Sequence, residues 1–233
     1  MATDRSGNRR IGIFGGTFNP IHYGHLRMAE EIAEGFALDR VYLVPSARPP
    51  HKGEMGLAAA ADRLAMVRRA VRGNPRLFAC DYECRQSGPS YAVATLERFR
   101  RRFPAAELFF LIGWDAWREI ATWHRWSRLF ELADFVVFSR GEEKLNCGEG
   151  ATGLFPFALQ ALFCYERGHC YRCRTGRRLH FVSTTRLDIS SSRIRELAAA
   201  GYSLRYLVPD GALRYLEERQ LYCQEPAELG GIV

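Results

Sequence analysis

Short apolar runs alternate along this chain with segments of helical period, and this alternation is the feature that most constrains the fold. The runs lie at residues 10–14, 41–44, 77–80, 108–112, 134–138 and 179–184. Between them apolar residues recur every three or four positions, which marks one buried face of a helix. The runs have no polar side, so both of their faces must be covered. The sequence therefore predicts an α/β fold, a doubly wound parallel sheet with helices on both faces.

The predicted elements divide the chain into one domain with two flanking segments. Residues 1–9 are polar and expected to be disordered, residues 10–222 form the single domain, and residues 223–233 are a tail. An insertion at about residues 141–178 interrupts the alternation and is expected to hold a helix and a hairpin. A final helix from about Pro209 to Tyr222 gives the domain a small helical C-terminal part, with proline suited to its first turn.

Composition restricts the class of protein. Of the 233 residues 47% are hydrophobic, yet no stretch reaches the roughly 18 uninterrupted apolar residues of a membrane helix. The first residues lack the apolar core of a signal peptide, so we expect a cytoplasmic protein with no membrane partner. The net charge is +7, but Lys52 and Lys144 are the only lysines, and the arginines are scattered. Scattered arginines are typical of a solvated surface, and no nucleic-acid partner is expected.

The seven cysteines do not indicate a disulfide framework or a metal site. Their number is odd and their spacing is not that of a small secreted domain, so we expect reduced thiols. Cys170 and Cys173 have a ligand-like CxxC spacing, but no second pair completes a tetrahedral set. The sequence therefore predicts no structural metal.

The first predicted strand ends in a glycine loop that leads into a helix, from Gly15 to His25. Two glycines let backbone amides approach a ligand closely, and a helix start directs free N–H groups and the positive end of its dipole to the same place. His22 and His25 are three residues apart, so both can face this point, and Gly24 leaves room between them. The pattern predicts an anion site.

A second anion-binding segment precedes the helix that carries Leu197. Serine hydroxyls, free amides and Arg195 one turn later can form a phosphate clamp, although serines at a helix start can also be simple caps. The segment reads Ile189, Ser190, Ser191, Ser192, Arg193, Ile194 and Arg195. We expect it to complete a triphosphate site with the glycine loop.

These two segments resemble the motifs of one family. Gly15 to His25 is similar to the GGxFxPxHxGH motif of the bacterial nicotinate-mononucleotide adenylyltransferases, within the HxGH nucleotidylyltransferase superfamily, and residues 189–195 are similar to its ISSTxIR motif, with Ser192 in place of threonine. The resemblance implies a Rossmann-like nucleotidylyltransferase fold and catalytic roles for His22, His25 and Arg195. It also implies an ATP site made of Gly15, Gly16, Thr17, Phe18, His22, His25, Gly113, Asp115, Ile189, Ser190, Ser191, Ser192 and Arg195.

Three further segments resemble the family's substrate-binding motifs. Residues 49–52 match its PPHK loop, residues 87–91 its SGPSY segment, and Gly113, Asp115 and Trp123 its GxDx7W pattern. By this resemblance the mononucleotide is bound by Thr17, Lys52, Ser90, Tyr91, Asp115 and Trp123. The carboxylate would accept ribose hydroxyls and the indole would stack on the pyridine ring. The family commonly has a threonine where this chain has Ala92, so no side-chain role is carried over there, and Ala94 also departs from the pattern.

The resemblance implies transfer of AMP from ATP to nicotinate mononucleotide, which gives nicotinate adenine dinucleotide and pyrophosphate in NAD biosynthesis. Mg²⁺ would arrive with ATP, and the partners would be these small molecules. Two alternatives stay open: a related transferase that acts on phosphopantetheine, and a nucleotide-sensing or nucleic-acid-binding protein that keeps the fold without catalysis. The preference for the acid over the amide mononucleotide rests on the resemblance alone, and the sequence does not give the oligomeric state.

Overall fold

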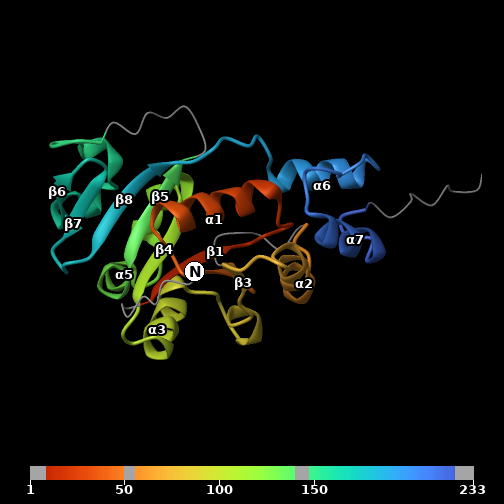
Figure 1. Ribbon diagram of the computed structural model, residues 1–233, viewed down its shortest axis with the longest axis horizontal. Coiled ribbons are helices and arrows are strands. Elements are labelled where there is room, and N and C mark those ends of the chain that lie inside the picture. The colour runs from red at the N-terminus through yellow and green to blue at the C-terminus, as the bar shows by residue number, and fades with distance from the viewer. Residues whose placement is uncertain (1–8, 50–55, 140–146, 224–233) are drawn as a thin grey trace, which may run out of the picture.

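Eight strands form one sheet in the order β3-β2-β1-β4-β5-β8-β7-β6 (Figure 1). The structure is a computed structural model that describes residues 9–49, 56–139 and 147–223. The first six strands of this order are parallel. The sheet then continues with β7, which is antiparallel to β8, and β6, which is antiparallel to β7. The strands are β1 (Arg10–Gly16), β2 (Arg40–Pro45), β3 (Leu77–Ala79), β4 (Glu107–Gly113), β5 (Asp134–Ser139), β6 (Phe163–Arg167), β7 (Cys170–Cys173) and β8 (Arg178–Ser183).

Seven α-helices and four short 3-10 turns cover the sheet. The helices are α1 (Tyr23–Gly35), α2 (Ala60–Ala70), α3 (Ala92–Arg102), α4 (Trp114–Arg118), α5 (Trp126–Leu132), α6 (Ser191–Ala199) and α7 (Asp210–Glu218). The 3-10 turns are η1 (Glu83–Arg85), η2 (Ile120–Thr122), η3 (Thr152–Leu154) and η4 (Phe157–Leu162). These counts refer to the described residues.

Two hydrophobic cores lie on opposite faces of the sheet. Alternate residues of β4 divide between them: Phe110 belongs to the core that includes residues of α3, α4 and α5, and Phe109 to the core that includes residues of α1, α2, α6 and α7. Both side chains are buried. The strands are thus apolar on both sides because both sides are covered, as the sequence predicted. The doubly wound α/β fold is confirmed.

The segment expected to be an insertion contains the predicted hairpin, formed by β6 and β7. In its described residues, 147–178, the short turns η3 and η4 stand in place of the expected helix. The sequence did not indicate that the hairpin joins the main sheet, where β7 pairs with the otherwise free edge of β8. Hydrogen bonding of that edge gives partners to backbone groups that would otherwise face solvent.

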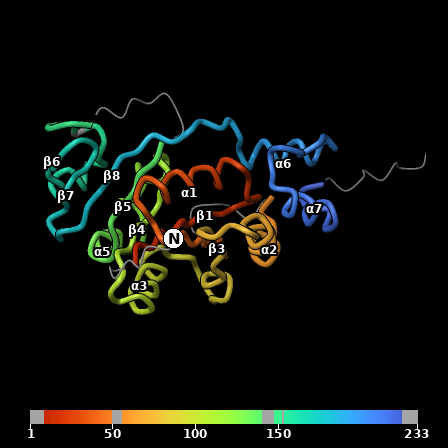
Figure 2. Tube along the Cα trace, in the orientation of Figure 1, coloured from red at the N-terminus to blue at the C-terminus, as the bar shows by residue number. Residues whose placement is uncertain are grey.

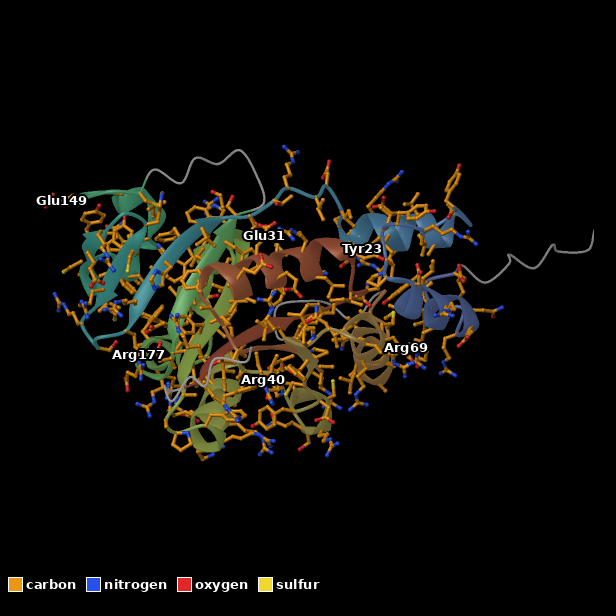
Figure 3. All side chains as sticks on the ribbon, in the orientation of Figure 1. Tyr23, Glu31, Arg40, Arg69, Glu149 and Arg177 are labelled. Atoms are coloured by element: carbon orange, nitrogen blue, oxygen red, sulfur yellow. The ribbon has the colours of Figure 1, made fainter. Side chains whose placement is uncertain are left out.

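The final helix is shorter than predicted. It covers Asp210–Glu218 with Pro209 as its N-cap, and the chain turns away where Gln220 has a φ of 48°. A left-handed residue cannot continue an α-helix. The helix packs on α2, where the Arg69 guanidinium lies 4.1 Å from the centre of the Tyr215 ring. Figure 3 labels Arg69 at this end of the molecule, opposite the β6–β7 hairpin.

Several expectations concern chain ends, membranes or metals. The expected disordered segment lies outside the described residues except for Arg9, as does the expected tail except for Cys223. None of the helices formed by residues 9–49, 56–139 and 147–223 combines the length and apolarity of a membrane span. Over the same residues, no group of three or more His, Cys, Asp or Glu side chains is arranged to hold a metal ion.

Candidate active site

The strand order reverses at β1, which lies between β2 on one side and β4 on the other. In sheets of this type ligands bind beyond the carboxyl ends of the strands at such a point. A cavity of about 400 Å³ lies there. Its walls include nine residues that the sequence analysis singled out: Gly15, Gly16, Thr17, His25, Ser90, Tyr91, Gly113, Asp115 and Trp123.

The glycine loop after β1 is held by close packing. Phe18 is buried with a φ of 47°, and its ring meets Phe14 edge to face with centroids 5.4 Å apart. A Cβ at Gly16 would approach the Phe18 ring to 3.0 Å, so a larger residue would displace that ring. Glycine at this position therefore lets the loop fold back onto the end of the strand.

The two histidines of the loop meet at the start of α1. Their ring centroids are 3.7 Å apart, and the His22 N–H donates to His25 Nδ1 at 3.3 Å. Since Nδ1 of His25 accepts this hydrogen bond, the proton of neutral His25 is on Nε2. His25 lines the cavity, whereas His22 is only 1% exposed and is not in the cavity wall. A Cβ at Gly24 would come within 3.0 Å of the His22 ring, so the pairing depends on glycine there.

The serine segment, residues 189–195, reaches the glycine loop from β8, which lies three strands from β1 in the sheet. After β8 the chain runs along α1, where the Thr185 N–H donates to Glu31 Oε2 at 2.8 Å (Figure 2; Glu31 is labelled in Figure 3). This path brings the carbonyl of Ile189 to within 3.7 Å of the position that a Cβ at Gly24 would take. Residues 189–195 therefore arrive at the start of α1.

Hydrogen bonds join the two motifs. Ser191 Oγ donates to the carbonyl of Pro20 at 2.9 Å, and Arg195 Nη1 donates to the carbonyl of Asn19 at 2.8 Å. Ser190 caps α6 by accepting from the Arg193 N–H at 3.1 Å. Arg195 Nη2 also donates to the hydroxyl of Ser192 at 3.3 Å. Segments about 170 residues apart in sequence thus form one cluster, although residues 189–195 are outside the cavity wall.

The other side of the cavity is aromatic. Trp123 follows η2 and meets Phe110 edge to face with centroids 6.3 Å apart. Tyr91 is the N-cap of α3, and its ring stacks on His124 at 4.3 Å. Asp115 is exposed on α4, at the same cavity. An aromatic wall beside a carboxylate is suited to a flat ring attached to a sugar.

On the mononucleotide side, the expectations for Lys52 and Ala92 have different outcomes. Lys52 lies outside the described residues, so its position relative to the cavity is not described. Ala92 lines the cavity without a hydroxyl, at the place where the resemblance expected one. Trp117 is outside the cavity wall and is a core residue, fully buried with its Nε1 donating to the Leu154 carbonyl at 2.8 Å.

The sequence analysis gave no role to Glu83 and His124, and both line the cavity. Glu83 is 5% exposed and its Oε1 accepts from Thr95 Oγ1 at 2.5 Å. Burial raises the pKa of this carboxyl, while the hydroxyls of Thr95, Ser90 and Ser46 oppose the rise. A buried acid in a turn has no periodic signal, and a histidine between Trp123 and Arg125 gives no indication that it faces a cavity.

Arg63 is a second residue that the sequence did not single out. It is fully buried, and its guanidinium donates to the carbonyls of Thr17 (2.7 Å), Ala58 (2.9 Å) and Ala47 (3.1 Å). It thereby joins the glycine loop to the segment after β2 and to the residues before α2. The only available signal was an arginine on the otherwise apolar face of a helix, next to Leu64.

Known proteins resemble this chain in sequence and in fold. A model of the cytidylyltransferase-like family matches residues 13–197. A probable nicotinate-nucleotide adenylyltransferase of Syntrophotalea carbinolica is 44% identical over 214 residues, covering 91% of this chain and 97% of that protein. One of Pseudomonas aeruginosa is 44% identical over 215 residues, covering 92% and 97%.

A solved structure shares the fold. The nicotinic acid mononucleotide adenylyltransferase of Plasmodium falciparum, in complex with NaAD, aligns with a TM-score of 0.68 at 19% identity, covering 92% of this chain and 98% of that one. The level of identity to the bacterial relatives, over nearly their whole length, is the stronger finding. The chain belongs to the nicotinate-nucleotide adenylyltransferase family of cytidylyltransferase-like proteins.

Proposed function

We propose that this protein transfers the AMP part of ATP to nicotinate mononucleotide, forming nicotinate adenine dinucleotide and pyrophosphate in NAD biosynthesis. One observation carries the proposal: the histidine pair and the Ser190–Arg195 clamp meet beside an aromatic cavity at the reversal point of the sheet. Relatives at 44% identity bear the name of this activity.

The chemistry requires alignment and charge neutralisation. A phosphate oxygen of the mononucleotide attacks the α-phosphorus of ATP, a P–O bond forms, and the bond to the β-phosphate oxygen breaks with that oxygen keeping the electron pair. No bond to the protein is made. Such transfers depend on holding the reactants in line and on stabilising negative charge as it shifts between oxygens.

The residues divide between the two substrates. His25 lines the cavity, and with His22 it would stabilise the α-phosphate. The backbone amides of Gly15, Gly16 and Thr17, which line the same cavity, would approach the phosphates. Ser190, Ser191, Ser192 and Arg195 would hold the departing pyrophosphate. Phe18, Gly113 and Ile189 would shape the ATP site. ATP would arrive as its Mg²⁺ complex.

On the mononucleotide side, Trp123 would stack on the pyridine ring and Asp115 would accept the ribose hydroxyls. Ser90, Tyr91 and Thr17 would line the same subsite, and Lys52 would approach the phosphates from its loop. We also propose a cytoplasmic location, where ATP is supplied, and no role in nucleic-acid binding.

The test is pyrophosphate release with ATP and one of three acceptors: nicotinate mononucleotide, its amide counterpart or phosphopantetheine. We expect fastest turnover with the acid form. His22→Ala and His25→Ala should each lower kcat by about 10²-fold or more, because each removes a group that stabilises developing charge. His169→Ala, an exposed histidine in the β6–β7 turn, is the matched control. Turnover with phosphopantetheine alone would contradict the assignment of Trp123, and no turnover with any acceptor would contradict the proposed reaction.

A further inference from the structure

Glu83 is a buried acid in the wall of the cavity, and the proposed chemistry does not use it. Its side chain is 5% exposed, and Oε1 accepts a hydrogen bond from Thr95 on α3. Oε2 is also buried, and among the described residues no group makes a hydrogen bond to it. A carboxylate in such a place costs stability unless neighbouring groups stabilise it.

The hydroxyl of Ser90 is the neighbour that connects Glu83 to the shape of the site. Ser90 Oγ accepts from the N–H groups of Ala47 (2.9 Å) and Arg48 (3.3 Å), and the Ser90 N–H donates to the Arg48 carbonyl at 3.0 Å. These bonds tie the segment after β2 to the segment before α3. With both lone pairs of Oγ engaged, its proton remains to be donated. The Ser90 hydroxyl opposes the rise that burial causes in the pKa of the Glu83 carboxyl.

The charged groups around Glu83 leave it without an ion-pair partner at bonding distance in the described part of the chain. Arg63 on α2 faces it, but that guanidinium donates to three carbonyls. On its own side, burial raises the pKa of the thiols of Cys80 and Cys84, so these groups stay neutral near pH 7. Asp115, Glu119, His25 and His124 line the same cavity. The carboxylate is therefore held mainly by the hydroxyls of Thr95, Ser90 and Ser46.

We propose that Glu83 is a positioning residue for the mononucleotide: its carboxylate, bonded to the Thr95 hydroxyl and close to that of Ser90, fixes the loop after β2 against the first turn of α3. The inference rests on the proposed function, because it concerns the pyridine-nucleotide side of that site. Protonation of Glu83 removes its negative charge, so the hydrogen bond from Thr95 and the attraction for the Ser90 hydroxyl both weaken. The mononucleotide subsite then loosens, while the ATP subsite at β1 and α6 does not.

The experiment compares Glu83→Gln with the wild type in KM and kcat for each substrate between pH 5 and 9. We expect the variant to raise KM for nicotinate mononucleotide roughly 10-fold at pH 7.5, as for loss of a buried charge-assisted hydrogen bond. KM for ATP and kcat should change little. In the wild type, KM for the mononucleotide should rise as pH falls toward the raised pKa of Glu83, and this rise should be smaller in the variant. Ionisation of the substrate phosphate affects both proteins equally.

Two further variants keep the test decisive. Glu97→Gln, on the same helix α3 and paired with Arg125, is the matched control and should leave both KM values unchanged. Thr95→Val removes a donor to Glu83 but keeps its charge, so the rise in KM should move to higher pH even if Glu83→Gln folds poorly.

The inference is overturned if Glu83→Gln leaves the mononucleotide KM and its pH profile unchanged, or if both substrates are affected equally. It is also overturned if Thr95→Val does not shift the profile. A wild type without turnover on nicotinate mononucleotide would instead overturn the proposed function itself, so the two failures are distinguishable.

Discussion

Replacement of Arg63 tests whether one buried side chain holds the loops of the site together. Arg63→Met keeps most of the aliphatic volume but removes three hydrogen bonds to the carbonyls of Thr17, Ala47 and Ala58. Each buried carbonyl left unpaired costs about 1–3 kcal/mol. Relief from burying a charge offsets part of this. We therefore expect a loss of about 3–6 kcal/mol in the free energy of unfolding, a large share of the ~5–15 kcal/mol typical of a domain.

Urea unfolding followed by circular dichroism measures this loss. With a slope of about 3 kcal/mol per molar, the midpoint should fall by roughly 1–2 M with the slope unchanged. The control is Arg68→Met on the same helix, where the guanidinium is 55% exposed and pairs with Asp81. A surface pair contributes about 1 kcal/mol or less, so its midpoint should move by less than roughly 0.3 M. If Arg63→Met moved the midpoint no more than Arg68→Met, the three hydrogen bonds would not be what holds these loops.

Three further predictions address the site, the C-terminal segment and pH. Trp123→Ala should raise KM for nicotinate mononucleotide by roughly 2- to 12-fold through loss of about 0.5–1.5 kcal/mol of stacking, with an unchanged KM for ATP; equal effects on both would contradict the stacking role. Tyr222→Phe should lower the unfolding free energy by about 0.5–1.5 kcal/mol, because the Tyr222 hydroxyl donates to Asn19 Oδ1 at 2.6 Å; no change in Tm would refute this. Burial lowers the pKa of His180 from 6.5 to about 4, so the stability it contributes is present above pH 6.5 and is lost as pH falls toward 4. His180→Phe should flatten that part of a stability-against-pH curve, and an unaltered curve would show that His180 does not titrate there.

Much of the fold could be predicted because its determinants are local. A run such as residues 108–112 has no polar side, and its two alternating faces enter the two cores, as that pattern requires. The sequence predicted the β6–β7 hairpin but not its place in the main sheet. Its pairing with β8 depends on a free strand edge elsewhere in the sheet, and sequence periodicity carries no information on that.

The site also has one part that the sequence indicated and one part that it did not. The glycine loop and the serine clamp are contiguous motifs, so the sequence indicated them, and the structure places Ser191 and Arg195 against Pro20 and Asn19. Arg63 and Glu83 were missed because their neighbours come from separate segments: residues 17, 47 and 58 for Arg63, and residues 46 and 90–95 for Glu83. The role of a single charged residue such as Arg63 or Glu83 can be seen only from a structure that shows which loops surround it.

The two borders of the eight-stranded sheet bear on how this protein avoids self-association through its backbone. A free strand edge offers a row of N–H and C=O groups to another molecule, which is the route to fibrils. At one border β3 is only three residues long. The border strand on the other side is β6, whose pairing register shifts between Tyr165 and Arg167. Glu166, at this irregularity, forms ion pairs with Arg172 and Arg178. A short strand on one side and an irregular, charged strand on the other make both borders poor templates for an incoming chain.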